Sequence, residues 1–263
     1  MAAYQRNISL GAAFSFSILL YTFSSMLNEK TVQDIKAFAI KNDWQEAFGG
    51  TSYGNQHLER MVKIALFLAD HLGADKQLVE AAAWLHDFPL SSGHDYNYQR
   101  NRAVTSTILD QFSLTESERE NIVECVAAHE GGGSATTVEA GIIHDADVLE
   151  KTGLLGIIRH TWKLVHSAHD PSVSHLSGEV RQHLHWRATQ LKTTLAQEIH
   201  RYLTENIPMS DEFVKKIVTL VQPLAARNII TEDIARELKS SLSESEYKKL
   251  EEQLSLEYLH RFN

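Results

Sequence analysis

Apolar residues recur every three or four positions along almost the whole chain from Thr31 onward, and this spacing constrains the fold most. It is the period of an amphipathic α-helix, whereas a half-buried strand alternates every second residue. The 263 residues include only four prolines and thirteen glycines, so few points interrupt the helical pattern. No Asn-Gly hairpin signal occurs. With 43% hydrophobic residues, we predict a globular, all-α protein.

The breakers between apolar runs predict where the helices begin and end. Seven helices are expected at about 31–48, 57–73, 79–86, 100–112, 116–129, 137–151 and 153–168. One long helix is expected at about 173–206. Pro208 then marks a break. Three further helices are expected at about 211–223, 232–241 and 245–261.

The first 27 residues allow three interpretations. Residues 8–27 carry no charge and are about long enough to span a bilayer, but serine, threonine and glycine dilute them. The segment is a leader or extension upstream of a start at Met26, a membrane-associated helix, or a signal peptide with Arg6 as its single positive charge. Under the first interpretation we expect a cytoplasmic protein. Under the others it is membrane-associated or exported, and membrane contact is expected only if this segment is retained.

The charge balance and the cysteine count exclude several classes of protein. The chain has 25 basic and 34 acidic residues, a net charge of −9, so no nucleic-acid partner is expected. Small anionic substrates remain open, because a bound cation can reverse the local field of an acidic protein. The single cysteine, Cys125, excludes an internal disulfide and a cysteine-rich zinc site.

Two histidines and an aspartate interrupt apolar helix faces. His57 lies in line with Met61 and Ile64, and His86-Asp87 ends an otherwise apolar helix. A buried imidazole needs partners for both nitrogens, and a buried carboxylate is costly unless it is neutralised. A divalent cation bound by His57, His86 and Asp87 would remove all of these costs together. Each position alone is weak, since a single histidine on an apolar face is more often a core residue.

A fourth ligand is expected in the apolar segment 141–153, which contains Asp145 and Asp147. At 100° per residue these side chains lie about 200° apart on a helix, so both should not bind one metal. Both flank the apolar face of the helix, and the periodicity does not decide between them.

The order His57, then His86-Asp87, then Ala146-Asp147 resembles the signature of the HD-domain phosphohydrolase superfamily, and of its small bacterial members with a single HD domain. Three local matches support the resemblance. Arg60 follows the first histidine by three residues, His129 stands in the sequence Ala-Ala-His-Glu, and residues 145–157 read Asp-Ala-Asp-Val-Leu-Glu-Lys-Thr-Gly-Leu-Leu-Gly-Ile. The similarity covers about residues 30–206.

This resemblance implies an HD-domain helical bundle at 28–206 and one divalent metal ion (Mn, Mg, Ni, Co, Fe or Zn). The extra C-terminal helices expected at 207–263 lie beyond the resemblance. The implied ligands are His57, His86, Asp87 and Asp147, because in the family the last ligand directly follows the alanine.

Two departures from the family pattern affect this expectation. Val148 stands where the family has an arginine. Dinuclear members place extra histidines before the last aspartate, and only His94 and His129 could fill that role here, so one metal is favoured.

The implied function is hydrolysis of a phosphate ester or anhydride, in a nucleotide or another small phosphorylated metabolite, by a metal-bound hydroxide. Asp87 could also steer the water, and Glu150 is either a base or a surface charge. Arg60 is the first candidate to contact phosphate, and His129 either lines the site or is a core histidine. Further candidates for the phosphate are Arg100, Arg102 and Lys151.

Other functions and assemblies stay open. A non-catalytic sensor would use the same site to bind metal and nucleotide without turnover. A di-iron oxygenase would need additional histidines. In the C-terminal segment, Tyr247, Leu250, Leu254 and Tyr258 form an apolar stripe, which would pack on the core or on a second copy in a homodimer. A lid over the site is a further alternative.

Overall fold

A computed structural model describes residues 27–46, 56–92, 96–130, 134–205 and 207–263. The predictions for residues 1–26 and for His94 lie outside these ranges. Within them every regular element is a helix and no strand occurs, which confirms the all-α prediction. None of the helices in the described part of the chain has the length and hydrophobicity needed to cross a membrane.

Six helices form the first part of the chain: α1 (Glu29–Glu46), α2 (His57–Leu72), α3 (Lys76–Leu85), α4 (Tyr98–Leu109), α5 (Glu116–Ala128) and α6 (Val138–Glu150). The second part contains α7 (Gly153–Ser167), α8 (Val173–Ala188), α9 (Thr194–Thr204), α10 (Asp211–Ala225), α11 (Thr231–Glu237) and α12 (Glu244–Ser255). Short 3-10 helices at Phe88–Ser92, Leu238–Ser241 and Glu257–Phe262 complete the described elements.

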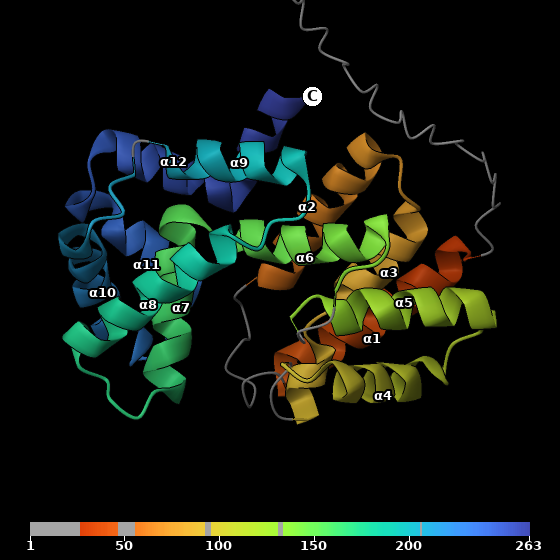
Figure 1. The fold of residues 1–263 in the computed structure, drawn as a ribbon. Coiled ribbons are helices and arrows are strands. Elements are labelled where there is room, and N and C mark those ends of the chain that lie inside the picture. The colour runs from red at the N-terminus through yellow and green to blue at the C-terminus, as the bar shows by residue number, and fades with distance from the viewer. Residues whose placement is uncertain (1–26, 47–55, 93–95, 131–133, 206) are drawn as a thin grey trace, which may run out of the picture.

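Buried apolar side chains gather in two clusters. The first joins α1 to α6 with α9 and the C-terminal residues Leu256–Leu259. The second joins α7, α8, α10, α11 and α12. Figure 1 shows α1 to α5 on one side of the molecule, α7, α8, α10 and α11 on the other, and α6 between them. The predicted boundary at residue 206 stays a prediction, but the two clusters do not divide there, because α9 belongs to the first and α7 to the second.

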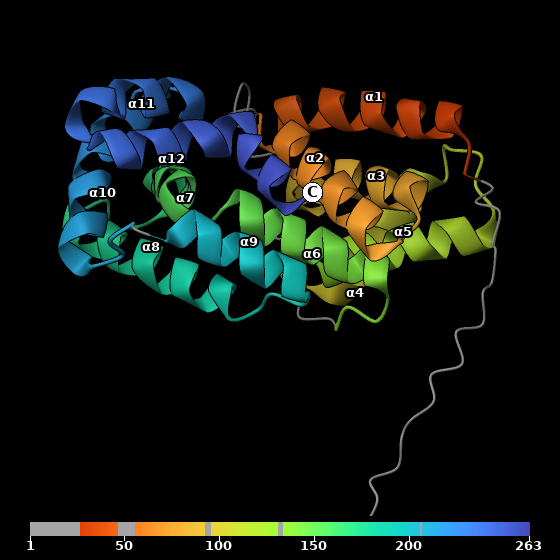
Figure 2. The ribbon, with the colours of Figure 1, turned by 90° about the horizontal axis from the view of Figure 1, so that it is seen from above.

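The long helix predicted at 173–206 is wrong, because the chain breaks between α8 and α9. The hydroxyl of Thr193 caps α9 by accepting from the Ala196 amide at 3.2 Å. The amides of Lys192 and Thr193 both donate to the carboxylate of Asp145 at 2.8 Å. The buried carboxylate of Asp145 on α6 therefore stabilises the turn between α8 and α9. Figure 2, which views the molecule from above, shows α9 lying along α6.

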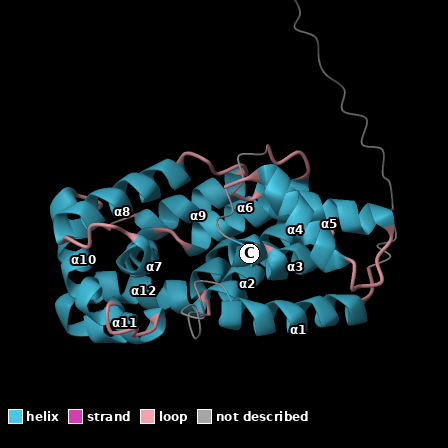
Figure 3. Cartoon of the chain, turned by 90° about the horizontal axis from the view of Figure 1, so that it is seen from below, coloured by secondary structure: helices cyan, strands magenta, loops and turns pink. Residues whose placement is uncertain are grey.

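Two predicted helices end at other residues in the structure than in the prediction. The helix expected to stop at 223 continues to Ala225, with Pro223 in its last turn. The helix expected at 245–261 ends at Ser255, because Leu256 adopts a left-handed φ of 62°. The chain then continues as a 3-10 helix, whose residues Tyr258 and Leu259 join the first cluster. Figure 3, coloured by secondary structure, shows only helices and loops in the described part of the chain.

The junction between α6 and α7 is tightly packed. Gly153 has a φ of +60°, which favours glycine. A Cβ at Gly156 would overlap the backbone carbonyl of Lys151. Gln253 of α12 joins the junction by donating to the Thr152 carbonyl at 2.8 Å and accepting from the Leu155 amide at 3.3 Å. This packing fixes the end of α6, where the candidate site residues lie.

Candidate metal site

His86 and His129 each follow the last residue of a helix, α3 and α5 respectively. The last carbonyls of a helix have no partner within it. His86 Nδ1 donates to the Ala83 carbonyl at 2.8 Å, and His129 Nδ1 donates to the Val126 carbonyl at 2.6 Å. A carbonyl only accepts, so Nδ1 carries the proton in both rings and Nε2 of the neutral ring is an acceptor.

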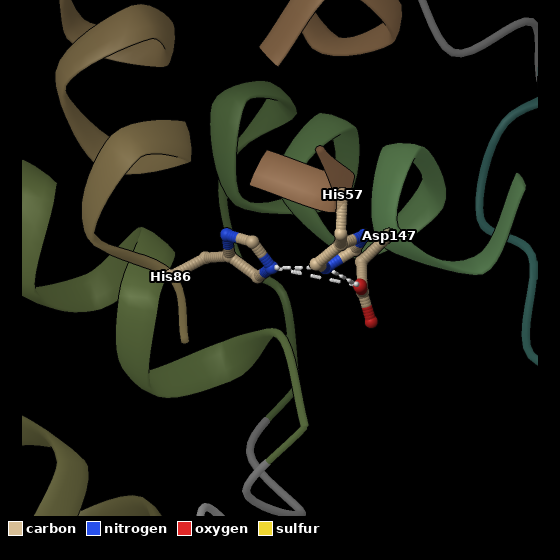
Figure 4. Close-up of side chains that lie close together, drawn as sticks. All are labelled: His57, His86 and Asp147. Carbon is tan, nitrogen blue, oxygen red and sulfur yellow. Dashed lines mark hydrogen bonds and ion pairs between the residues drawn. The ribbon is translucent and has the colours of Figure 1, made fainter. Parts of the chain in front are cut away.

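His57 begins α2 and meets His86 from the opposite side, as Figure 4 shows. Its Nδ1 lies 2.8 Å from Glu150 Oε2, and its Nε2 lies 3.2 Å from His86 Nε2. Because the carboxylate accepts the Nδ1 proton, Nε2 of a neutral His57 is also a bare lone pair. The two imidazoles therefore aim acceptor nitrogens at each other.

Two carboxylates complete the cluster. Asp147 Oδ1 lies 3.4 Å from His57 Nε2 and 3.5 Å from His86 Nε2. Asp87 Oδ2 lies 3.2 Å and 3.3 Å from the same two nitrogens. None of the four side chains belongs to a residue more than 7% exposed. The structure thus brings the four predicted ligands together, and His57, His86 and Asp147 have the mutual spacing of a metal-binding group.

The donors of this cluster fit a cation. Two bare imidazole nitrogens and two carboxylates repel one another unless positive charge lies among them. A proton can supply that charge: burial lowers the pKa of His86, but Asp87 and Asp147 outweigh burial and raise it to about 10. A divalent metal ion can supply the charge instead, since imidazole nitrogen and carboxylate oxygen are its usual ligands. The burial and the donor set agree with a metal site.

Asp145 and Asp147 point to different parts of the molecule. Asp147 joins the histidines, whereas Asp145 accepts three bonds of 2.8 Å from the turn before α9. This is the divergence expected from their separation on one helix. The periodicity did not decide which aspartate is the fourth ligand, and the resemblance implied Asp147. The position of Asp147 beside the two histidines agrees with that prediction.

Glu150 is not a surface charge, because it is only 2% exposed. Its carboxylate binds His57 Nδ1 at 2.8 Å, Arg60 Nε at 2.9 Å and Arg159 Nε at 3.1 Å. Burial raises the pKa of Glu150, but Arg159, His57 and Arg60 outweigh it and lower the pKa to about 2. So weak a base is poorly suited to take a proton from water near neutral pH. The geometry instead gives Glu150 the role of orienting His57.

Arg60 lies beside the cluster but does not face its cavity. It is 4% exposed and donates to Glu150 at 2.9 Å and to Glu232 of α11 at 2.6 Å. It is not among the residues that line the cavity next to Asp87. The prediction that Arg60 contacts phosphate is therefore not supported by this arrangement.

The cavity next to the cluster is rich in positive charge. Asp87 lines it together with four cationic side chains, Lys151, Arg159, Lys163 and Arg187, and one further carboxylate, Glu130. Lys151 Nζ lies 2.6 Å from Asp147 Oδ1, and Arg187 Nη1 lies 2.9 Å from Asp147 Oδ2. The cavity is thus electrostatically suited to an anion bound beside Asp87 and Asp147.

Two stacked histidines form another part of the cavity wall. The rings of His160 and His183 are nearly parallel, with centroids 3.8 Å apart. Burial, followed by Lys151, lowers the pKa of His183 to about 4. Burial and His183 hold the pKa of His160 well below its ordinary value. Both rings are therefore neutral near pH 7.

Several residues at the site were not predicted from the sequence: Arg159, Arg187, Glu232, and also Glu130, His160, Lys163 and His183 in the cavity wall. Arg187 had a detectable signal, because it continues the buried stripe of Leu176, Val180 and Leu184 on α8. Glu232 had none, since an acid in the first turn of a helix is ordinary. The other predicted phosphate contacts lie elsewhere: Arg100 is exposed, and Arg102 pairs with Glu120 and Glu124.

Comparisons with known proteins agree with this site. The family model of the HD domain matches residues 55–152, a range that includes all four clustered residues. Ribonuclease Y from three strains of Clostridium perfringens is 30% identical over 102 residues, which are 38% of this chain and 19% of that protein. The chain therefore spans about one fifth of the length of these curated relatives. The crystal structure of selenomethionine-labelled Bacillus subtilis YpgQ has a similar fold, with a TM-score of 0.52 and 19% identity over 75% of this chain and 95% of that one.

Proposed function

We propose that this chain is a metal-dependent phosphohydrolase, because residues 55–152 match the family model of the HD domain. Its substrate would be a phosphate ester or anhydride, in a nucleotide or another small phosphorylated metabolite. One observation carries the proposal: Asp87 belongs both to the buried cluster of histidines and carboxylates and to the wall of a cavity with four cationic side chains. A metal ion and a phosphate group could therefore be bound side by side.

In this proposal His57, His86, Asp87 and Asp147 hold one divalent ion. When bound, such an ion lowers the pKa of water and polarises a phosphoryl oxygen. Glu150 keeps the proton of His57 on Nδ1, so that Nε2 faces the ion. The donor set does not select among Mn, Mg, Ni, Co, Fe and Zn.

The remaining groups bind and orient the substrate. Lys151 and Arg187 lie against Asp147 and line the cavity, where they would balance the negative charge that grows on phosphate in the transition state. Asp87 faces the histidines through Oδ2, while its Oδ1 lies 3.9 Å from His129 Nε2. We assign Asp87 to orienting the attacking water, and His129 to lining the site beside it.

Cleavage of RNA is a second candidate function, because the similarity to ribonuclease Y covers the HD domain. The net charge of −9 favours a small substrate over a polyanion. The sensor and the di-iron oxygenase are distinguished by measurement: a sensor binds metal and nucleotide without turnover, and the oxygenase requires two irons per chain.

The test is a hydrolysis screen with Mn, Mg, Ni or Co. Substrates are nucleoside mono-, di- and triphosphates, simple phosphomonoesters and phosphodiesters, and a short RNA. We expect metal-dependent release of phosphate or pyrophosphate by the wild type, its loss in His86→Ala, and its retention in the exposed control His175→Ala. Turnover of RNA alone would support the second candidate, and metal binding without any turnover would contradict the hydrolase.

A further inference from the structure

The C-terminal helices reach the candidate metal site through a buried ion pair. Arg60 Nη1 on α2 donates to Glu232 Oε1 on α11 at 2.6 Å, across 172 positions of sequence. The side chain of Arg60 is 5% exposed and that of Glu232 is 15% exposed. Shielding from water strengthens the attraction between the two charges of such a pair.

Arg60 also contacts Glu150, which in turn contacts the predicted metal ligand His57. Its Nε donates to Glu150 Oε1 at 2.9 Å, and Glu150 Oε2 binds His57 Nδ1 at 2.8 Å. The order of contacts is therefore Glu232, Arg60, Glu150 and His57, with each step shorter than 3 Å. A carboxylate on the far nitrogen of a liganding histidine fixes both its tautomer and its orientation.

A second contact ties the same C-terminal segment to the end of α6. Gln253 of α12 bonds the backbone on both sides of the α6–α7 junction, at Thr152 and Leu155. Glu150 ends α6 only two residues before this junction. The C-terminal segment thus contacts the arginine partner of Glu150 and the backbone that follows Glu150 at Thr152 and Leu155.

We propose that Glu232 is a positioning residue of the metal site, which acts through Arg60 to hold Glu150 against His57. This proposal rests on the proposed function, because it assumes that His57 binds a metal. In the native arrangement Arg60 is shared between two carboxylates. With Glu232 neutralised, Arg60 interacts more strongly with Glu150, which weakens the bond that Glu150 accepts from His57 and lowers the basicity of Nε2.

The test is the affinity of the metal-free protein for Mn²⁺, measured by isothermal titration calorimetry. We expect Glu232→Gln to raise the Kd about 10-fold, at the lower end of the range for residues that support a ligand. Glu237→Gln removes an exposed acid from the same helix and should leave the Kd unchanged.

A double-mutant cycle separates positioning from general stabilisation. In Arg60→Lys the ammonium cannot span both carboxylates, so adding Glu232→Gln should change the Kd less than about twofold.

If Glu232→Gln loses its helical circular dichroism, Glu232→Asp replaces it, and we expect an intermediate Kd. An unchanged Kd in the folded Glu232 variant overturns the proposal, even if its unfolding temperature falls. A wild type that binds none of Mn²⁺, Mg²⁺, Ni²⁺, Co²⁺, Fe²⁺ and Zn²⁺ would instead refute the proposed function.

Discussion

At the scale of single residues, the site depends on buried charges that are stabilised by other side chains rather than by water. Glu150 is the clearest example, since its carboxylate has hydrogen bonds with His57 and Arg60 and forms an ion pair with Arg159. An isolated buried carboxylate would take up a proton, whereas this one has a pKa of about 2. Its ionisation is therefore coupled to the folded arrangement of His57, Arg60 and Arg159.

Replacing Glu150 by glutamine should therefore lower the stability of the protein in a pH-dependent way. The pKa of Glu150 falls from 4.5 to about 2 on folding. The carboxylate thus contributes stability that is complete above pH 4.5 and is lost as the pH falls toward 2. We expect the metal-free variant to be less stable than the wild type at about pH 7, by a few kcal/mol. The difference should shrink between about pH 4.5 and pH 3.

Urea unfolding of both proteins across this pH range, with a chelator present, provides the measurement. A difference in the free energy of unfolding that stays constant with pH would contradict the low pKa of Glu150.

The members of the cluster could be predicted from the sequence because they are polar residues at positions where the helical pattern predicts buried apolar ones. His57, His86 and Asp147 are indeed buried. The partners of Arg60 could not be predicted in this way. Its bond to Glu232 depends on how α11 packs against α2, and neither helix carries a local signal for it.

At the scale of elements, α6 directs its acids to two places. Asp145 caps the turn before α9, while Asp147 and Glu150 enter the site. The helix stops at Glu150, and Lys151 is turned against Asp147 before α7 begins. The conformation of the α6–α7 junction therefore sets the position of Lys151 in the cavity.

Gly156 should be essential to this junction. A Cβ there would overlap the backbone carbonyl of Lys151, so Gly156→Ala must shift the junction. We expect a loss of about 1–3 kcal/mol in the free energy of unfolding, measured by urea denaturation. Gly178→Ala on α8 is the matched control, because no atom lies within 4 Å of its added Cβ. Alanine favours helix over glycine, so the control should be neutral or up to about 1 kcal/mol more stable. Equal stability of Gly156→Ala and the wild type would show that the junction adapts.

The helices that sequence predicted well are those with local start and stop signals. The structure places α5 and α6 within one or two residues of the predicted ranges, and threonine caps begin both. The break between α8 and α9 was missed for a physical reason. It depends on Asp145, which lies 47 positions before Lys192, and no local window contains that contact.

At the scale of the whole molecule, the cavity lies where the two hydrophobic clusters meet. Residues next to the first cluster supply the His/Asp group, and α7, α8 and α11 supply the opposite wall with Arg159, Arg187 and Thr231. The all-α class and the similarity to the HD domain could be predicted from the sequence, because the helical period and the order of the candidate ligands are properties of the chain. The role of residues 207–263 in completing the wall could not, because it follows from packing between distant helices.

The metal site is tested most directly by the Mn²⁺ stoichiometry and affinity of Asp147→Asn compared with Asp145→Asn. We expect one ion per chain in the wild type and in folded Asp145→Asn, because the Asp145 carboxylate of the wild type binds the turn before α9 and not the site. We expect Asp147→Asn to lose more than the roughly 10–100-fold in affinity typical of a supporting residue, and to lose phosphate release with it. Metal retained in Asp147→Asn but lost in folded Asp145→Asn would contradict the site.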